Sequence, residues 1–496
     1  MAKEFSWGID LPIVVVLYLL SIVFIGYYSY KKRLGVSVRD FFTASKTLGY
    51  VVLGLGLFAT IASGNTYLGY AGQAYRAGGY PFLVVPAFYV SIIIGFLLLG
   101  TKIIPLSNKK GYITPGDYLK DRFGSTALTA FLLLLMFWCT FVQFFEQSIA
   151  MGYIGEVTSG GYLSYEVSAA LFTIAVVLLT LLGGFRGTAL ANFVMGVVMV
   201  AGLLGALFGI VPILGGAEIL ARAATSSSSI KVVLPEKPET YLGWISTVLL
   251  IMFGVIAYFQ VWNFIIANKD LKSLREQFKF SIAIYAIIPT IFVILGVLGL
   301  ALFPGLSKAE SEKVQIYLIN EAASRSPAGY VLGELILLAV VAATLSTAAA
   351  VIFAMAMTLA KDFYAKLVNP RADEKKILNV AKILIVALGA FGYLIVMTPK
   401  LTLWEWVVLK FQVGLQAVAP LLLSLYIPWV NSRGAWAGSA IGFAIVVGSY
   451  LSGITKLYNF DLGVLGFLVN AALVLLVSYL TKKPDEVAKA AEIIAV

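Results

Sequence analysis

The sequence predicts an all-α integral membrane protein with about thirteen transmembrane helices. Two observations support this prediction: the composition of the chain and the spacing of its apolar runs. Hydrophobic residues make up 60% of the 496 residues and charged residues 12%, whereas a soluble domain is about half apolar and about a quarter charged. Apolar runs of about 18 residues or more recur along the chain, and each is long enough to cross a hydrocarbon layer of roughly 30 Å.

The predicted spans follow one another with short connections, which excludes a soluble multidomain protein. They cover residues 11–28, 49–72, 80–100, 126–152, 166–184, 188–213, 241–266, 279–303, 330–357, 376–397, 402–428, 434–453 and 462–481. The first span has no basic segment before it and no small-residue cleavage site after it, so we expect a transmembrane helix and not a cleaved signal peptide. Residues 307–326 and the tail at 484–496 predict short helices outside the membrane.

Basic clusters predict the orientation of the chain. Lys31 and Arg33 follow the first span, which places the N-terminus outside and, with thirteen spans, the C-terminus in the cytoplasm. The other clusters fall on the same predicted cytoplasmic side: Lys109, Lys110, Lys269, Lys272, Arg275, Arg371, Lys375, Lys376, Lys482 and Lys483. Because loop lysines and arginines account for the net charge of +11, we expect membrane lipid as a partner, no nucleic acid and no obligate protein partner.

The titratable residues argue against an enzyme. The chain has no histidine and one cysteine, Cys139, so His-based triads, imidazole metal sites and cysteine-rich metal sites are excluded. No span pairs a nucleophile with a base. A channel would need rings of charge or filter repeats, and a sensor would need a signalling domain; the sequence offers neither.

Two spans contain residues that suit a broken helix. The second has several glycines around the polar run at residues 63–66, and the seventh has Gly254 followed by Tyr258, Gln260 and Asn263. Glycine at membrane depth also serves close helix packing, and both interpretations stay open for each span. The two spans stand five predicted spans apart, and broken helices at matching positions of two halves indicate a substrate site near the midplane.

Four stretches resemble, in order, the sodium/solute symporter family. They are DFFTASKTLG at 40–49 with ASG at 62–64 and GYAG at 69–72; GGFRG at 183–187; AATLST at 342–347; and PLLLSLY at 420–426 with GAWAG at 434–438. The resemblance covers roughly residues 10–450.

The resemblance implies a leucine-transporter-like fold with two inverted five-helix repeats. The implied divisions are a first helix and loop at 1–48, repeats at 49–240 and 241–430, and two further helices with a tail at 431–496. It also implies a multi-pass protein of the plasma membrane that uses sodium as its coupling ion. Its function would be secondary active symport of a small organic solute by alternating access.

The resemblance also implies the ligands of one sodium ion. They are the backbone carbonyls of Ala59, Ala62 and Ala343 and the hydroxyls of Ser346 and Thr347. These residue types suit the ion, because sodium is a hard cation that prefers oxygen, and an unwound backbone supplies carbonyls. The alternative is that the two hydroxyls bond back to carbonyls of their own helix.

Two positions depart from the pattern of the relatives. Ile61 and Asn192 stand where relatives carry aspartate, which predicts a single coupling ion. Glu146 lies in mid-span and is a candidate proton site, with a structural hydrogen bond as the alternative. Lys410 and Glu405 are near enough in sequence to pair, but we expect Lys410 to extend toward the membrane surface.

The substrate pocket is predicted to be apolar and aromatic. Val85, Tyr285 and Val255 replace the polar residues of sugar-transporting relatives, which disfavours a sugar. The predicted pocket residues are Thr66, Phe88, Gln143, Tyr258, Phe259, Tyr285 and Gln412, with Gln416 as a further candidate.

Such a pocket suits a small solute with one polar end, an amino acid such as proline or a monocarboxylate. The free amides of residues 64–66 are expected to meet a carboxylate. The alternatives are a proton-coupled porter of the same fold or a sugar symporter.

Overall fold

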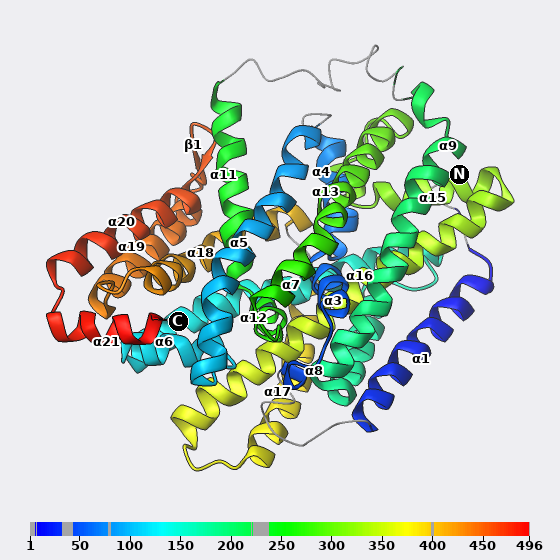
Figure 1. Cartoon of the computed structure of the whole chain (residues 1–496). Coiled ribbons are helices and arrows are strands. Elements are labelled where there is room, and N and C mark those ends of the chain that lie inside the picture. The colour runs from blue at the N-terminus through cyan, green and yellow to red at the C-terminus, as the bar shows by residue number, and fades with distance from the viewer. Residues whose placement is uncertain are drawn as a thin grey trace.

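The computed structural model describes residue 5 and residues 7–31, 43–77, 81–219, 221, 238–397 and 401–495. Apart from one two-stranded hairpin, the regular elements of these residues are helices (Figure 1). The motif residues at 40–42 and the loop after residue 221 lie outside the described residues.

The first half of the chain runs from α1 to α9. Its elements are α1 (Asp10–Lys31), η1 (Ala44–Lys46), α3 (Tyr50–Ile61), η2 (Asn65–Gly69), α4 (Tyr70–Ala77), α5 (Pro81–Lys110), α6 (Pro115–Phe123), α7 (Thr126–Thr158), α8 (Tyr165–Gly205), η3 (Ala206–Ile210) and α9 (Val211–Ile213). The long helix α8 is interrupted at Gly184, whose φ of +58° is left-handed. Glycine adopts this conformation without a steric penalty, so the predicted fifth and sixth spans meet there directly.

The second half runs from α11 to α21. Its elements are α11 (Pro238–Gly254), η4 (Val255–Ala257), α12 (Phe259–Ile266), α13 (Leu271–Leu302), α14 (Lys308–Ser311), α15 (Val314–Arg325), α16 (Pro327–Thr358), η5 (Leu359–Val368), α17 (Glu374–Val396), α18 (Leu403–Tyr426), α19 (Ser432–Leu451), β1 (Lys456–Leu457), β2 (Phe460–Asp461), α20 (Leu462–Leu480) and α21 (Pro484–Ile494). The helices α14, α15 and α21 confirm the short helices predicted at 307–326 and in the tail.

Within the described residues, 11 helices are long and apolar enough to cross a membrane, and the count reaches 12 if the bent pair α3 and η2–α4 forms one span. The helix over Tyr165–Leu181 is apolar but shorter than these. An all-helical, multi-pass architecture is therefore confirmed, whereas the total of thirteen spans stays a prediction.

The helices differ strongly in burial. The apolar window of the span that begins with α16 is 89% buried, and that of α1 is 17% buried. α16 packs against α8, α7 and α3, and it therefore forms the centre of the bundle. Figure 1 shows α1 at one side of the molecule and α19 and α20, which pack on each other, at the opposite side. The central position of α16 places its residues close to the broken second span.

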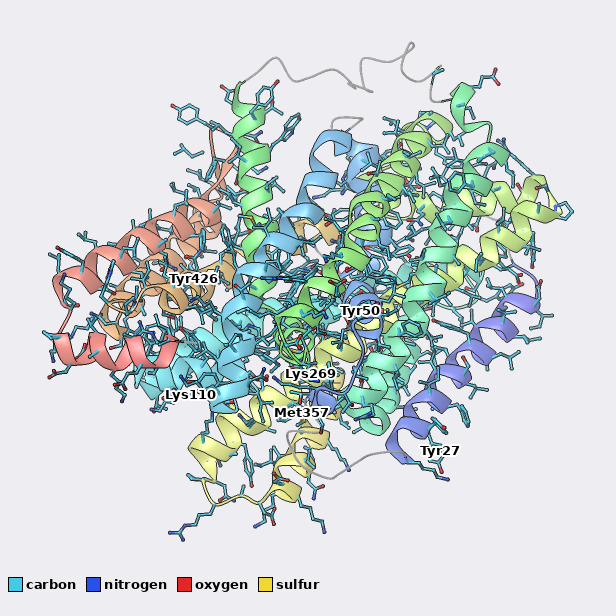
Figure 2. All side chains as sticks on the ribbon, viewed as in Figure 1. Tyr27, Tyr50, Lys110, Lys269, Met357 and Tyr426 are labelled. Carbon is cyan, nitrogen blue, oxygen red and sulfur yellow. The ribbon has the colours of Figure 1, made fainter. Side chains whose placement is uncertain are left out.

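Two of the basic residues predicted to face the cytoplasm lie on the same side of the bundle. Figure 2 shows Lys110 and Lys269 in the lower half of the view, where Tyr27 near the end of α1 also lies. The predicted orientation requires Lys110, Lys269 and the end of α1 to lie on the same side of the membrane. Which side faces the cytoplasm stays a prediction.

Both predicted helix breaks are present. α3 ends at Ile61, Ala62 leaves the helical region with ψ 88°, and the chain resumes at a 60° bend. The seventh span is interrupted at Tyr258, which is extended with ψ 126°.

Close packing also requires glycine at the first break. A Cβ on Gly64 would lie 2.6 Å from Thr344 Cγ2 and 2.7 Å from Ala150 Cβ. Both interpretations of the second span, close packing and a broken helix, therefore hold at this residue.

Candidate functional site

The first polar site joins the end of α3 to the middle of α16. The Ser346 hydroxyl donates to the carbonyl of Ala59 at 2.7 Å and to that of Ala343 at 3.1 Å. The Thr347 hydroxyl donates to the carbonyls of Thr60 at 3.0 Å and Ala59 at 3.3 Å. All of these residues are buried. Oxygen atoms from two helices therefore converge on one point.

This pattern differs from ordinary back-bonding of hydroxyls in membrane helices. Thr344, on the same helix, shows the ordinary pattern, because its hydroxyl donates to Val340 and Val341 within α16. The Ser346 hydroxyl also donates within its helix, to Ala343, but both it and the Thr347 hydroxyl reach across to carbonyls of α3. The alternative in which both merely satisfy their own helix is therefore wrong.

The neighbouring residues complete a neutral set of oxygens. Ala62, the remaining predicted ligand, is buried where α3 ends. The Asn192 amide donates to the Thr60 hydroxyl at 2.8 Å and to the Ser346 carbonyl at 3.2 Å. Its Oδ1 atom is buried and has no hydrogen-bond partner among the described residues. Uncharged carbonyls and hydroxyls suit a monovalent cation. A divalent cation prefers carboxylate ligands.

The second polar site is a buried ion pair that links α7 to α18. The Lys410 ammonium donates to the carboxylate of Glu146 and to Oε1 of Gln143. The Tyr258 hydroxyl donates to the same Gln143 oxygen at 2.5 Å. The Lys410 and Glu146 side chains are 1% and 0% exposed. Glu146 is therefore buried beside a cation and not alone.

The expectation that Lys410 extends to the membrane surface is wrong, because its ammonium is buried against Glu146. Glu405 instead pairs with Lys308 at 2.8 Å, and both side chains are exposed. The sequence contained a usable signal, since two opposite charges in mid-span each need a partner inside the bundle.

A small cavity lies beside the ion pair. It has a volume of about 30 Å³ and lies where the break between α3 and η2 meets α7, α11 and α18. This is room for one or two water molecules. Its wall includes the predicted residues Thr66, Gln143 and Tyr258, and also Lys410 and Phe411, which were not predicted.

Other predicted pocket residues lie elsewhere. The Phe259 amide donates to the Thr140 hydroxyl at 3.2 Å, and the Tyr285 ring packs on Phe58 with centroids 5.7 Å apart. Both side chains are buried away from the cavity wall. The side chain of Phe88 lies outside the described residues.

Gln412 and Gln416 face α20. The Gln412 amide donates to Asp461 at 3.4 Å, and that of Gln416 donates to the carbonyl of Gly463 at 3.1 Å. Residues two positions apart on a helix differ by about 200°, so Gln412 points away from the face that carries Lys410. The helix geometry therefore removes Gln412 from the cavity wall.

One of the amides expected to meet a carboxylate, that of Gly64, is already bonded, and so is the neighbouring amide of Ser63. The Gly64 N–H donates to the Gln147 side chain at 2.8 Å, and the Ser63 N–H donates to the Thr66 hydroxyl at 3.1 Å. In this conformation these two amides are therefore not free to anchor a carboxylate.

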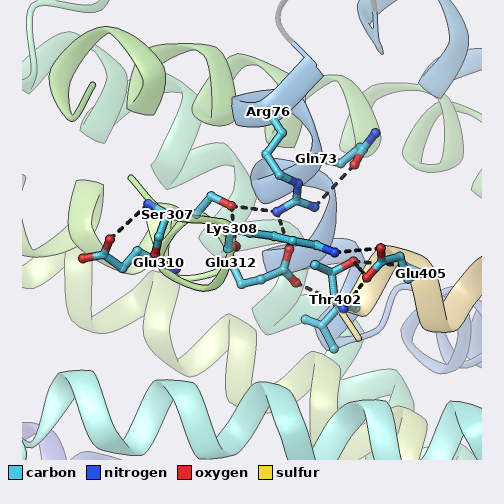
Figure 3. Close-up of polar contacts among 10 residues, drawn as sticks. Gln73, Arg76, Ser307, Lys308, Glu310, Glu312, Thr402 and Glu405 are labelled. Carbon is cyan, nitrogen blue, oxygen red and sulfur yellow. Dashed lines mark hydrogen bonds and ion pairs between the residues drawn. The ribbon is translucent and has the colours of Figure 1, made fainter. Parts of the chain in front are cut away.

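An ionic network lies at the end of the bundle that is predicted to face outside (Figure 3). Arg76 at the end of α4 donates to Glu312 at 2.6 Å and to Ser311 at 2.7 Å. The other oxygen of Glu312 accepts the N–H of Leu403, the first residue of α18, at 3.0 Å. Burial raises the pKa of the Glu312 carboxyl, and Arg76 opposes this shift. The network ties the segment of α14 to α4 and α18.

A second network lies at the predicted cytoplasmic end. Asp117 of α6 pairs with Lys361 and, at 2.8 Å, with Lys366, both in η5. Lys366 also pairs with Asp362 at 2.6 Å, which accepts from the Thr114 hydroxyl at 3.0 Å. Burial opposes ionisation of Asp117, but the two lysines hold its pKa well below the usual range. Each end of the bundle thus carries its own ionic network.

Comparison with known proteins identifies relatives of this chain. A model described as the Sodium:solute symporter family matches residues 41–442. The chain is 28% identical over 448 residues to the sodium/pantothenate symporter of Escherichia coli, which covers 87% of this chain and 88% of that protein. It is 24% identical over 487 residues to the osmoregulated proline transporter of Bacillus subtilis, which covers 96% of each.

A solved structure of a Na+-coupled sialic acid symporter is also similar. The TM-score is 0.74 at 18% sequence identity, and the match covers 95% of this chain and 98% of that one. At this identity the likeness shows the fold alone, and it supports the leucine-transporter-like class. The division into two inverted repeats stays a prediction.

Proposed function

We propose a transport mechanism from the premise that this chain belongs to the Sodium:solute symporter family. As a member of that family it is a multi-pass membrane transporter and not an enzyme, and it couples the movement of a small solute to sodium. The solute we propose is a small organic molecule with an apolar body and one polar end, proline or a monocarboxylate. It crosses by alternating access, in which the two ends of the bundle open in turn.

The proposed sodium ligands are the carbonyls of Ala59, Ala62 and Ala343 and the hydroxyls of Ser346 and Thr347. One observation supports this assignment: both hydroxyls reach across to the carbonyl of Ala59 at the end of α3. A cation at this point would be held by the same oxygens, with the hydroxyl protons turned away. Binding would therefore fasten the end of α3 to α16.

Sodium binding and solute binding are coupled because the proposed ion site and the cavity share one unwound segment of the chain. Residues 59–62 supply carbonyls to the proposed ion site, and Thr66, a few residues later, lines the cavity. Ordering of this unwound segment by sodium would prepare the solute site. Because coupling free energy is reciprocal, the solute must strengthen sodium binding by the same factor.

We propose one coupling ion per solute. Ile61 and Asn192 supply no carboxylate near the break, and the ligands of the proposed site are neutral. A proton-coupled porter is the second candidate because Glu146 is buried next to the cavity-lining residue Gln143. The pairing of Glu146 with Lys410 makes this candidate the weaker one, since the carboxylate already has a counter-ion.

Uptake into proteoliposomes tests the proposed function. Labelled proline, pyruvate and glucose should be offered separately under a sodium gradient and under a pH gradient. We expect sodium-driven accumulation of proline or pyruvate and none of glucose, because the described cavity wall is mostly apolar. Accumulation that follows only the pH gradient would contradict sodium coupling, and sodium-driven accumulation of glucose would contradict the solute class.

The network around Glu312 predicts a conformational effect of Arg76→Gln. The variant leaves a buried carboxylate without its cation, and Arg76 is 22% exposed. The closed outer end should therefore lose about 1–2 kcal/mol, which is roughly a tenfold change in the open population. The measurement is the labelling rate of an Ile92→Cys variant at the cavity wall, in a Cys139→Ala background, by an impermeant thiol reagent added outside.

Lys308→Gln provides the matched control. It also removes a cation from an ion pair at this end of the bundle, but Lys308 and Glu405 are 61% and 41% exposed. Exposed pairs contribute little, so labelling should change less than twofold. Equal labelling of the Arg76→Gln variant and the parent would show that this pair does not hold the outer end closed.

A further inference from the structure

We propose that Lys410 is the anchor for the carboxylate of an organic anion, and that Glu146 is the counter-ion that holds the ammonium in place when no solute is bound. The inference rests on the proposed function, because it names the solute class of the same cavity. It selects a monocarboxylate over a zwitterion such as proline.

The Lys410 ammonium lies next to the cavity. Lys410 lines the cavity, whereas its partner Glu146 does not belong to the cavity wall. Gln143, which the ammonium also contacts, lies on the wall as well, so the ammonium is beside the cavity and the Glu146 carboxylate is outside its wall. An ammonium has three N–H donors, and in the described part of the chain the bonds to Glu146 and Gln143 use two of them. One donor is left for a solute.

The residues around the ammonium are aromatic and aliphatic. It lies over the rings of Tyr258 and Phe411, 5.6 Å and 5.3 Å from their centroids, and both residues line the cavity. Ile251 and Val255 extend the apolar wall. In this conformation the cavity holds only one or two waters, so a solute enters only when the bundle opens. The wall it then meets, one cationic donor among aromatic and aliphatic side chains, suits a carboxylate on a short apolar body.

Two backbone donors near the cavity already have partners in the protein. The amides of Ser63 and Gly64 are bonded to Thr66 and Gln147, so they do not compete for a carboxylate in this conformation. Lys410 is the only basic residue on the described cavity wall. It is therefore the group best placed to compensate a negative charge.

The charges also favour an anion over a zwitterion. Lys410 and Glu146 neutralise each other, so the empty cavity is electrically balanced. An anion that arrives with one sodium ion keeps this balance, and the sodium and the ammonium both attract it. The ammonium of a zwitterion would be buried near Lys410, while Glu146 is not on the wall to receive it.

Sodium-driven uptake of pyruvate, its uncharged amide and proline tests the inference. We expect the wild-type protein to accumulate pyruvate in preference to the other two. The Glu146→Gln, Lys410→Gln double variant removes both charges while it keeps similar shapes, so no buried charge is left alone. It should lose apparent affinity for pyruvate by about tenfold to a hundredfold, because a hydrogen bond to a charged group is lost.

The Lys308→Gln, Glu405→Gln double variant is the matched control. It removes one ion pair that also involves α18, but at the exposed end of that helix. Its affinity for pyruvate should be unchanged. A sodium-induced rise in Tm, measured for every variant, shows that each one is folded and still binds the ion.

The remaining outcomes separate the two proposals. Unchanged affinity for pyruvate in the Glu146→Gln, Lys410→Gln variant would overturn the role of Lys410. Sodium-driven uptake of proline without pyruvate would overturn the inference and leave the proposed function intact. Absence of sodium-driven uptake of proline, pyruvate and the amide alike would overturn the proposed function itself.

Discussion

Replacement of Ser346 and Thr347 by alanine should weaken sodium binding by about a hundredfold, since each hydroxyl bonded to a cation contributes about 1.5 kcal/mol or more. The two hydroxyls meet the carbonyl of Ala59 at 2.7 Å and 3.3 Å. Their loss removes every proposed side-chain ligand and leaves only backbone carbonyls. The sodium concentration that gives half-maximal uptake measures the effect. If uptake is too slow, the sodium-induced shift in Tm reports the same affinity.

Thr344→Val is the matched control for this prediction. Thr344 is on the same helix, and its hydroxyl bonds back to Val340 and Val341 within α16. Valine keeps the shape of threonine and removes only the hydroxyl. The control should leave the sodium dependence nearly unchanged. An equal loss in both variants would mean that the helix has been disturbed and that the two hydroxyls are not specific ligands.

The helical membrane fold could be predicted because it depends on local properties. Apolar runs set the spans, and the polar run at 63–66 set the first break, which is now seen as a 60° bend after Ile61. The boundary between the fifth and sixth spans was harder to place. The sequence predicts two spans, 166–184 and 188–213, whereas the chain continues through α8 with a single left-handed residue, Gly184.

The proposed ion site could be predicted only with the family motif. Ser346 and Thr347 are adjacent, so the sequence alone shows that they lie near one face of a helix. Their partner Ala59 lies 287 residues from Ser346. Nothing in the local sequence selects that carbonyl, because any unwound backbone offers one. The resemblance supplied the pairing, and the geometry then brought the atoms together.

The cavity shows where sequence reasoning failed. The nearest acidic residue to Lys410 in the sequence of its span is Glu405, five residues away. Its partner in the structure is Glu146, which is 264 residues away. The cost of an unpaired charge inside a membrane would have favoured the distant pair. Gln412 is expected on the cavity because it falls on a polar site position of the relatives. A turn of about 200° from Lys410 takes it to the opposite face of α18.

The Glu146→Gln variant should be much less stable than the wild-type protein. It leaves the ammonium of Lys410 buried, at 1% exposure, with no carboxylate beside it. Loss of one partner from a buried ion pair costs about 3–5 kcal/mol of folding free energy. The Tm of the detergent-solubilised protein should fall clearly at every pH between about 6 and 8, where an ordinary lysine is charged.

The Glu146→Gln, Lys410→Gln variant should recover most of this loss, because replacement of a buried pair by neutral groups is often nearly neutral. Glu156→Gln is the matched control, since Glu156 pairs with Lys313 at 2.5 Å but is 38% exposed, and it should change Tm little. A proton carrier at Glu146 predicts a different pattern. In that case the single variant would be stable and would lose only pH-driven transport. A stable Glu146→Gln variant would therefore contradict the counter-ion role and would return Glu146 to the position of a candidate proton site.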